Sequence, residues 1–87
     1  MVNIEELKKK IIYRSNYRGT KEMDKLLGAF AETYIDSLSE KDLFDLEKLL
    51  NVDDTNLYNF YNDLKTDVEI ENNKVTSLFK DFEYKNE

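Results

Sequence analysis

Apolar residues recur every three or four positions along almost the whole chain, which is the spacing of one face of an α-helix. Proline is absent and glycine occurs only at Gly19 and Gly28, so little interrupts this spacing. No alternation of apolar and polar residues persists long enough to indicate a strand. The pattern predicts an all-α protein with five short helices, over about residues 3–15, 20–38, 39–50, 54–64 and 73–82.

Side chains that can accept hydrogen bonds from free backbone N–H groups stand at the start of several of these helices. Asn3 can cap the first helix, and Ser39 followed by Asp42 is a capping-box pair for the third. Asp54 or Thr55 can cap the fourth helix. The sequence therefore predicts separate helices, because a continuous coiled coil would need apolar heptads that run on through these positions.

The second helix is the longest and most apolar segment, and short connections place consecutive helices side by side. We therefore expect a small antiparallel bundle, a single domain of residues 1–87 in which residues 84–87 fray. The residues expected to line the core of the second to fifth helices are Met23, Leu26, Leu27, Phe30, Ala31, Tyr34, Ile35 and Leu38; Leu43, Leu46, Leu49 and Leu50; Leu57, Phe60, Tyr61 and Leu64; and Val75, Leu78, Phe79 and Phe82.

The composition argues against most enzyme mechanisms. The 87 residues include no histidine and no cysteine, which removes disulfides, thiolate metal sites and the most common general base at neutral pH. No catalytic triad, phosphate-binding loop or metal-ligand cluster is visible. The acidic residues around the fourth helix lack the glycine turn and the terminal glutamate of a calcium-binding loop. We expect a protein that is not an enzyme and holds no metal.

Charge is distributed unevenly along the chain. The net charge of −6 opposes general binding to nucleic acids, and no long apolar run suggests insertion into a membrane. Residues 1–21 contain six basic and two acidic side chains, a net charge of +4, which leaves −10 for residues 22–87. A basic end on an acidic body indicates a docking face for an acidic partner surface or, alternatively, a solvated lysine-rich helix face.

The start of the chain bears on where the protein works. It begins directly with the first predicted helix, without an Arg- and Ser-rich presequence. We therefore expect a protein of the bacterial cytoplasm, or of the mitochondrial matrix if the chain is a processed eukaryotic product.

Three residues at the junction of the first and second helices have a spacing with a physical rationale: Arg18, Gly19 and Glu22. Gly19 can adopt a positive φ and lets another backbone approach closely. Arg18 can present its forked donors to a carboxylate or a carbonyl group of a partner. Glu22, near the positive end of the second helix, can orient Arg18 or accept hydrogen bonds from a partner. The alternative is a glycine turn with a surface ion pair and a helix-start carboxylate.

These residues lie in the run RGTKEMDKLLGAF, residues 18–30. The run, with Arg18, Gly19 and Glu22 in R-G-x-x-E, resembles the signature of the SdhE-type succinate dehydrogenase assembly factors, small proteins that promote covalent attachment of FAD. Downstream, the stretch LSEKDLFDLEKLLNVDDTNLYNFY is similar to the second block of that family. The resemblance covers roughly residues 10–64 in order and spacing.

The resemblance implies a five-helix bundle that binds the flavoprotein subunit of succinate dehydrogenase or of its fumarate reductase relative. It further implies that the protein helps FAD become joined to a histidine of that subunit, and that it acts on the partner's FAD and binds none covalently itself. Without His or Cys, this chain cannot carry the usual histidyl or cysteinyl flavin, so it would act by positioning. The partner-binding residues that the resemblance implies are Tyr13, Arg14, Ser15, Arg18, Gly19, Glu22 and Asp24.

A second class of function stays open from the residues alone. It is a regulatory protein-interaction module, of an antitoxin-like kind, whose partner is not a flavoprotein. The R-G-x-x-E corner inside an otherwise matching block favours the assembly factor. In either case we expect the free protein to be a monomer.

Overall fold

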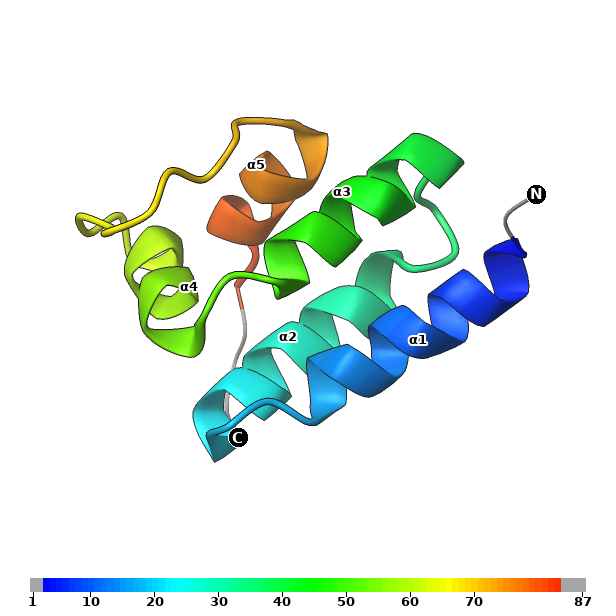
Figure 1. Ribbon diagram of the computed structural model, residues 1–87, viewed down its shortest axis with the longest axis horizontal. Helices are drawn as coiled ribbons and strands as arrows, with labels where there is room; N and C mark the ends of the chain where they lie inside the picture. The colour runs from blue at the N-terminus through cyan, green and yellow to red at the C-terminus, as the bar shows by residue number, and fades with distance from the viewer. Residues whose placement is uncertain (1–2, 84–87) are drawn as a thin grey trace.

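The computed structural model describes residues 3–83. This part of the chain forms five helices and no strand: α1 (Ile4–Asn16), α2 (Lys21–Tyr34), α3 (Glu40–Leu50), α4 (Asp54–Tyr61) and α5 (Lys74–Asp81) (Figure 1). The predicted all-α fold with five helices is confirmed. The predicted fraying of residues 84–87 lies outside the described residues.

The first three helices run back and forth beside one another, and the last two complete the bundle (Figure 1). α1 lies against both α2 and α3, while α5 packs against α3 and α4. The turn between α1 and α2 and the turn between α3 and α4 therefore lie near the same end of the bundle. None of the helices in the described part of the chain is long and apolar enough to cross a membrane.

Every helix begins at a residue whose side chain accepts a hydrogen bond from the first turn. For α3 this residue is Ser39, which forms the predicted capping box with Asp42. For α4 the prediction of Asp54 or Thr55 is wrong, because the cap is one residue earlier. The five capping residues are Asn3, Thr20, Ser39, Asp53 and Asn73.

Asp53 caps α4 because its backbone is extended and its carboxylate faces the first turn. The carboxylate accepts hydrogen bonds from the side-chain amide of Asn56 at 2.7 Å and from the backbone N–H of Asn56 at 3.2 Å. These bonds lower the pKa of Asp53 below its ordinary value, with the side-chain amide as the largest cause. The stabilising cap is therefore fully present at neutral pH and is lost only as the pH falls through that lowered pKa. This arrangement leaves the neighbouring carboxylate of Asp54 free for another role.

Two helices end earlier than the apolar spacing predicts. α2 ends at Tyr34, not near Leu38, because the Tyr34 carbonyl accepts from the N–H of Ser37 at 2.9 Å and from its hydroxyl at 3.0 Å, which closes a turn. Ile35 and Leu38 are nevertheless buried, as expected. The chain thus keeps the same apolar side chains in the core while it leaves the helix.

α4 ends at Tyr61, and the prediction that Leu64 continues its buried face is wrong. Asp63 has a φ of 58°, a left-handed conformation that terminates helices. The N–H of Leu64 then donates to the carbonyl of Asn59 at 2.7 Å, which reverses the chain. The Leu64 side chain is 57% exposed as a result.

One apolar cluster joins all five helices, and aromatic rings fill the region where α2, α4 and α5 meet. The ring of Phe30 lies 5.3 Å from that of Phe79, edge to face, and Phe79 also contacts Phe60 and Tyr61. Phe30 and Phe79 are fully buried, as predicted, whereas Phe60 and Tyr61 are partly buried and pack against the core. The fully or nearly fully buried apolar residues are Leu7, Ile11, Met23, Leu26, Leu27, Phe30, Ala31, Ile35, Leu38, Leu43, Leu46, Leu49, Leu50, Leu57, Val75 and Phe79.

Gly28 permits the close packing of α1 on α2. A Cβ atom at this position would collide with the side-chain oxygen of Asn16 on α1. That side chain is held in place because its amide donates to the carbonyl of Ile12 at 2.8 Å. Glycine inside α2 therefore leaves room for the Asn16 side chain, although it costs helix propensity.

The central position of α2 generates a stability prediction. Leu27 is completely buried, so Leu27→Ala should lower the free energy of unfolding by about 2–5 kcal/mol. Lys25→Ala, on the exposed side of the same helix, should change it by no more than about 0.5 kcal/mol. Urea unfolding followed by far-UV circular dichroism measures both variants. Equal losses in the two variants would contradict a core built around α2.

Candidate functional site

The side chain of Arg18 ties together the two turns at one end of the bundle. Its Nε donates to Oδ1 of Asp54 at 2.8 Å, and its two terminal nitrogens donate to the carbonyls of Leu50 at 2.6 Å and Val52 at 2.7 Å. The side chain is only 11% exposed. Arg18 thus satisfies carbonyl groups at and just beyond the end of α3, which have no partner within the helix.

Arg18 therefore differs from its expected role. The sequence predicts a guanidinium that reaches toward a partner protein and is oriented by Glu22. In the structure the guanidinium faces inward and its charged partner is Asp54, 36 residues away along the chain. A pairing at this separation has no signature in local spacing, so the sequence does not reveal Asp54 as the partner of Arg18.

We call the end of the bundle where the residues from Arg18 to Glu22 meet the start of α4 the corner. Asp54 uses both carboxylate oxygens to hold it together. Oδ1 accepts from Arg18, and Oδ2 accepts from the backbone N–H of Gly19 at 3.1 Å. Asp54 is also the first residue of α4, where the positive end of the helix dipole favours a negative charge. A single carboxylate thus connects the α1–α2 turn to the start of α4.

Gly19 is exposed, as expected, but the prediction of a positive φ is wrong. A Cβ atom at this position would lie 3.3 Å from Oδ2 of Asp54, which is closer than an ordinary van der Waals contact. The glycine therefore lets a carboxylate of the same chain come close to its N–H group. Its outer side is open to solvent.

The two acidic residues in the first turn of α2 have different surroundings. Asp24 is half-buried and accepts a hydrogen bond from the backbone N–H of Arg18, so it fixes the turn from inside. Glu22 is exposed, and its side chain makes no hydrogen bond or ion pair within residues 3–83. Of the charged groups at this corner, Glu22 is the one whose carboxylate is available to another molecule.

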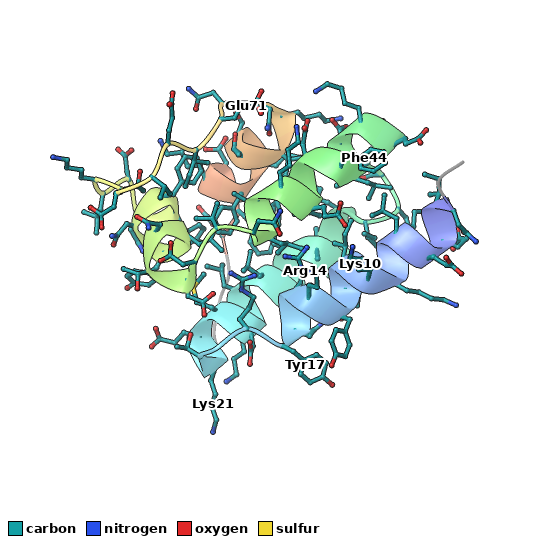
Figure 2. The ribbon with its side chains drawn as sticks, in the orientation of Figure 1. Lys10, Arg14, Tyr17, Lys21, Phe44 and Glu71 are labelled. Atoms are coloured by element: carbon teal, nitrogen blue, oxygen red, sulfur yellow. The ribbon has the colours of Figure 1, made fainter. Side chains whose placement is uncertain are left out.

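The three residues that precede the corner point in three directions from α1. Tyr13 is 65% exposed and its ring lies 4.7 Å from that of Tyr17, which projects from the edge of the molecule (Figure 2). Arg14 donates to the side-chain oxygen of Asn51 at 2.6 Å, across the α3–α4 turn. Ser15 is completely buried and its hydroxyl has no hydrogen-bond partner among the described residues. The expected surface position is therefore found for Tyr13 but not for Ser15.

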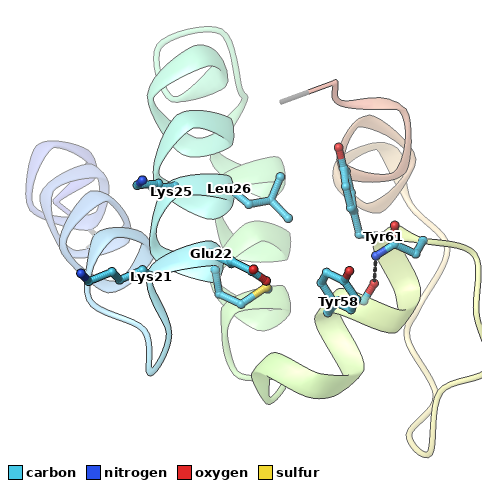
Figure 3. A pocket seen from close by; sticks show the side chains of 8 residues that line it. Lys21, Glu22, Lys25, Leu26, Tyr58 and Tyr61 are labelled. Carbon is cyan, nitrogen blue, oxygen red and sulfur yellow. Dashed lines mark hydrogen bonds between the residues drawn. The ribbon is translucent and has the colours of Figure 1, made fainter. Parts of the chain in front are cut away.

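A groove of about 350 Å³ separates the start of α2 from α4 (Figure 3). Glu22 points across it toward Tyr58 (Figure 3). A smaller hollow beside it, also lined by Glu22 and Tyr58, extends to Asp54 and Thr55. We call the first of these the Glu22 groove. Its lining residues are Lys21, Glu22, Met23, Lys25, Leu26, Tyr58, Tyr61 and Asn62.

The accessible groups at this end of the bundle are few, and most of its acidic side chains are already bonded within the chain. The described residues include no group of three or more acidic, histidine or cysteine side chains that could hold a metal ion. Asp53 and Asp54, which resemble potential ligands in the sequence, are occupied by the cap of α4 and by Arg18. What remains accessible is the carboxylate of Glu22, the open side of Gly19, and a groove lined by both apolar and charged side chains.

The internal position of Arg18 generates a second stability prediction. Arg18→Ala should lower the free energy of unfolding by about 2–4 kcal/mol, because it leaves a carboxylate and two carbonyl groups without their partner. Lys21→Ala, three residues away on the exposed start of α2, is the matched control and should change little. Urea unfolding tests both. A loss no greater than that of the control would show that Arg18 does not hold the two turns together.

Comparisons with known proteins agree with the sequence resemblance. A relative from Dictyostelium discoideum, "succinate dehydrogenase assembly factor 2, mitochondrial", is 44% identical over 57 residues, which are 66% of this chain and 40% of the relative. "FAD assembly factor SdhE" of Acetobacter pasteurianus is 34% identical over 55 residues, or 63% of this chain and 50% of the relative. A second assembly factor 2, from Meyerozyma guilliermondii, is 39% identical over 54 residues, 62% and 40% of the two chains.

The matches span 40–50% of the length of these relatives. No solved structure matches this chain. The model of the family described as "flavinator of succinate dehydrogenase" matches residues 9–83, which include the whole corner from Arg18 to Glu22 and all of α2 to α5. The chain therefore belongs to the succinate dehydrogenase flavinator family.

Proposed function

We propose that this protein is an assembly factor that binds the flavoprotein subunit of succinate dehydrogenase and promotes covalent attachment of FAD to it. The observation that carries the proposal is the family match over residues 9–83, with the R-G-x-x-E residues inside it. The curated relatives come from a bacterium and from mitochondria. The bacterial cytoplasm and the mitochondrial matrix are accordingly the two proposed sites of action.

The chain's own residues support a helper role, not a catalytic one. It has neither histidine nor cysteine, so the usual flavin linkage has to form on the partner. Its contribution is then to hold the flavoprotein in a geometry that brings the reacting groups together, which can supply much of a rate acceleration. The flavoprotein subunit of fumarate reductase, which is related to that of succinate dehydrogenase, is a second proposed partner.

In this proposal some residues of the R-G-x-x-E segment contact the partner, and others hold the surface in shape. Gly19 and Glu22 are exposed and face the flavoprotein. Arg18 and Asp24 act from inside, because they bond to Asp54 and to the turn itself and so fix the shape of the surface. Tyr13 extends the contact along α1.

Two substitutions of Gly19 can distinguish a variant that no longer binds its partner from a variant that no longer folds. Gly19→Ala and Gly19→Arg place the same Cβ atom 3.3 Å from Asp54, but only arginine adds bulk on the open side. We expect both variants to melt at similar temperatures, and only Gly19→Arg to lose most covalent FAD in a co-expressed flavoprotein. In-gel flavin fluorescence, in cells without their own factor, gives the readout.

Normal flavin incorporation with Gly19→Arg would show that this corner is not part of the interface with the flavoprotein. Absence of any effect of the wild-type chain on flavin incorporation would contradict the proposed function itself. Binding to a partner that is not a flavoprotein would then favour a regulatory module.

The missing histidine and cysteine lead to a further prediction. After co-expression with the flavoprotein and FAD, the intact mass of this chain should be the same as when it is expressed alone, with no added flavin mass. The flavoprotein from the same cells should carry the added flavin mass. A flavin adduct on this chain, found by mass spectrometry of the separated proteins, would contradict its role as a helper.

A further inference from the structure

The Glu22 groove contains one charged group that points into it. Figure 3 shows Glu22 and Leu26 directed toward α4, whereas Lys21 and Lys25 extend from the opposite side of α2. Asp54, in the adjoining hollow, is neutralised by its ion pair with Arg18. Lys21 and Lys25 also line the groove, but their side chains extend away from α4, so the carboxylate of Glu22 is the charged group that faces the tyrosine rings.

The walls around this carboxylate are apolar and aromatic. Met23 and Leu26 of α2 form one side, and the rings of Tyr58 and Tyr61 of α4 form the other (Figure 3). The Tyr61 hydroxyl donates to the carbonyl of Phe82, which fixes that ring. Tyr58 is 47% exposed and its hydroxyl makes no bond within residues 3–83, so its ring is open to a ligand.

A carboxylate beside apolar and aromatic walls favours a ligand that has an apolar stem and a positively charged end. An apolar stem can pack on Met23 and the tyrosine rings, and a positive group at its end can reach the carboxylate of Glu22. A guanidinium group suits this position better than an ammonium group, because it is planar, stacks on aromatic faces and pairs with a carboxylate through two hydrogen bonds. The groove volume of about 350 Å³ is at the small end for a ligand pocket.

We propose that the Glu22 groove receives an arginine side chain of the partner protein, which pairs with Glu22 and stacks on Tyr58. The inference rests on the proposed function for the identity of that protein, the flavoprotein subunit. It adds the chemistry of the contact: a carboxylate on this chain, an aromatic wall, and one arginine on the partner. It also gives a reason for the exposed position of Glu22 beside α4.

The first test needs no partner protein. Met23 lines the groove and the chain has only two methionines, so a methyl-labelled sample gives one signal from the groove and one from Met1. N-acetylarginine amide should shift the Met23 signal saturably in the wild type and not in Glu22→Gln. N-acetylcitrulline amide, which has the same shape without the charge, should shift neither. Equal shifts with both probes, a larger shift with N-acetyllysine amide, or no shift at all would overturn the inference.

The second test uses the flavoprotein subunit and isothermal titration calorimetry. Glu22→Gln should weaken binding at least about tenfold, as expected for the loss of a charge-assisted hydrogen bond. Tyr58→Ala should weaken it as well, while Tyr58→Phe, which keeps the ring, should bind like the wild type. Glu32→Gln, an exposed change of the same kind on the same helix, is the matched control and should have no effect. Unchanged melting temperatures establish that each variant is folded.

The outcomes separate this inference from the proposed function. If the wild type binds the flavoprotein and Glu22→Gln binds within twofold of it, the arginine contact is overturned and the proposed function stands. If the wild type does not bind at all, the proposed function fails, and the titration with N-acetylarginine amide decides whether the groove is an arginine site. A charge swap would identify the partner residue. Glu22→Arg should lose binding to the flavoprotein, and changing the right arginine of the flavoprotein to glutamate should restore it.

Discussion

The ion pair between Arg18 and Asp54 holds together the end of the bundle where the α1–α2 turn meets the α3–α4 turn. A charged side chain that is almost fully removed from water is costly unless its donors are satisfied. Arg18 satisfies this requirement with a carboxylate and two carbonyl groups from α3 and the following turn. The same carboxylate then binds the N–H group of Gly19, so the two turns hold each other in place.

This internal role changes how the R-G-x-x-E residues are understood. The arginine acts as a structural tie, and the glycine makes room for the carboxylate that completes it. Only the glutamate remains without a partner in the described residues, and it points across the groove toward α4. The contacts of Arg18 and Asp54 hold the turn that precedes Glu22, so binding does not have to order this part of the backbone. The groove and the corner are therefore two parts of one surface.

The sequence was sufficient for the helices but not for the corner. Apolar spacing and the Ser39 cap are local, so they predict element type and most core residues correctly. The end of α4 depends on the left-handed residue Asp63, which spacing does not reveal. The direction of Arg18 depends on groups more than 30 residues away, and the burial of Ser15 depends on how α1 packs. Tertiary contacts therefore decide the positions of Arg18 and Ser15, and a local turn decides the end of α4.

A double-mutant cycle between Arg18 and Asp54 tests the central claim most directly. The free energies of unfolding of the wild type, Arg18→Ala, Asp54→Ala and the double variant would be measured in urea by circular dichroism, since the chain has no tryptophan. The ion pair predicts that the double variant loses less stability than the sum of the single losses, with a coupling energy of at least about 1 kcal/mol. Additive losses, within about 0.5 kcal/mol, would contradict the account.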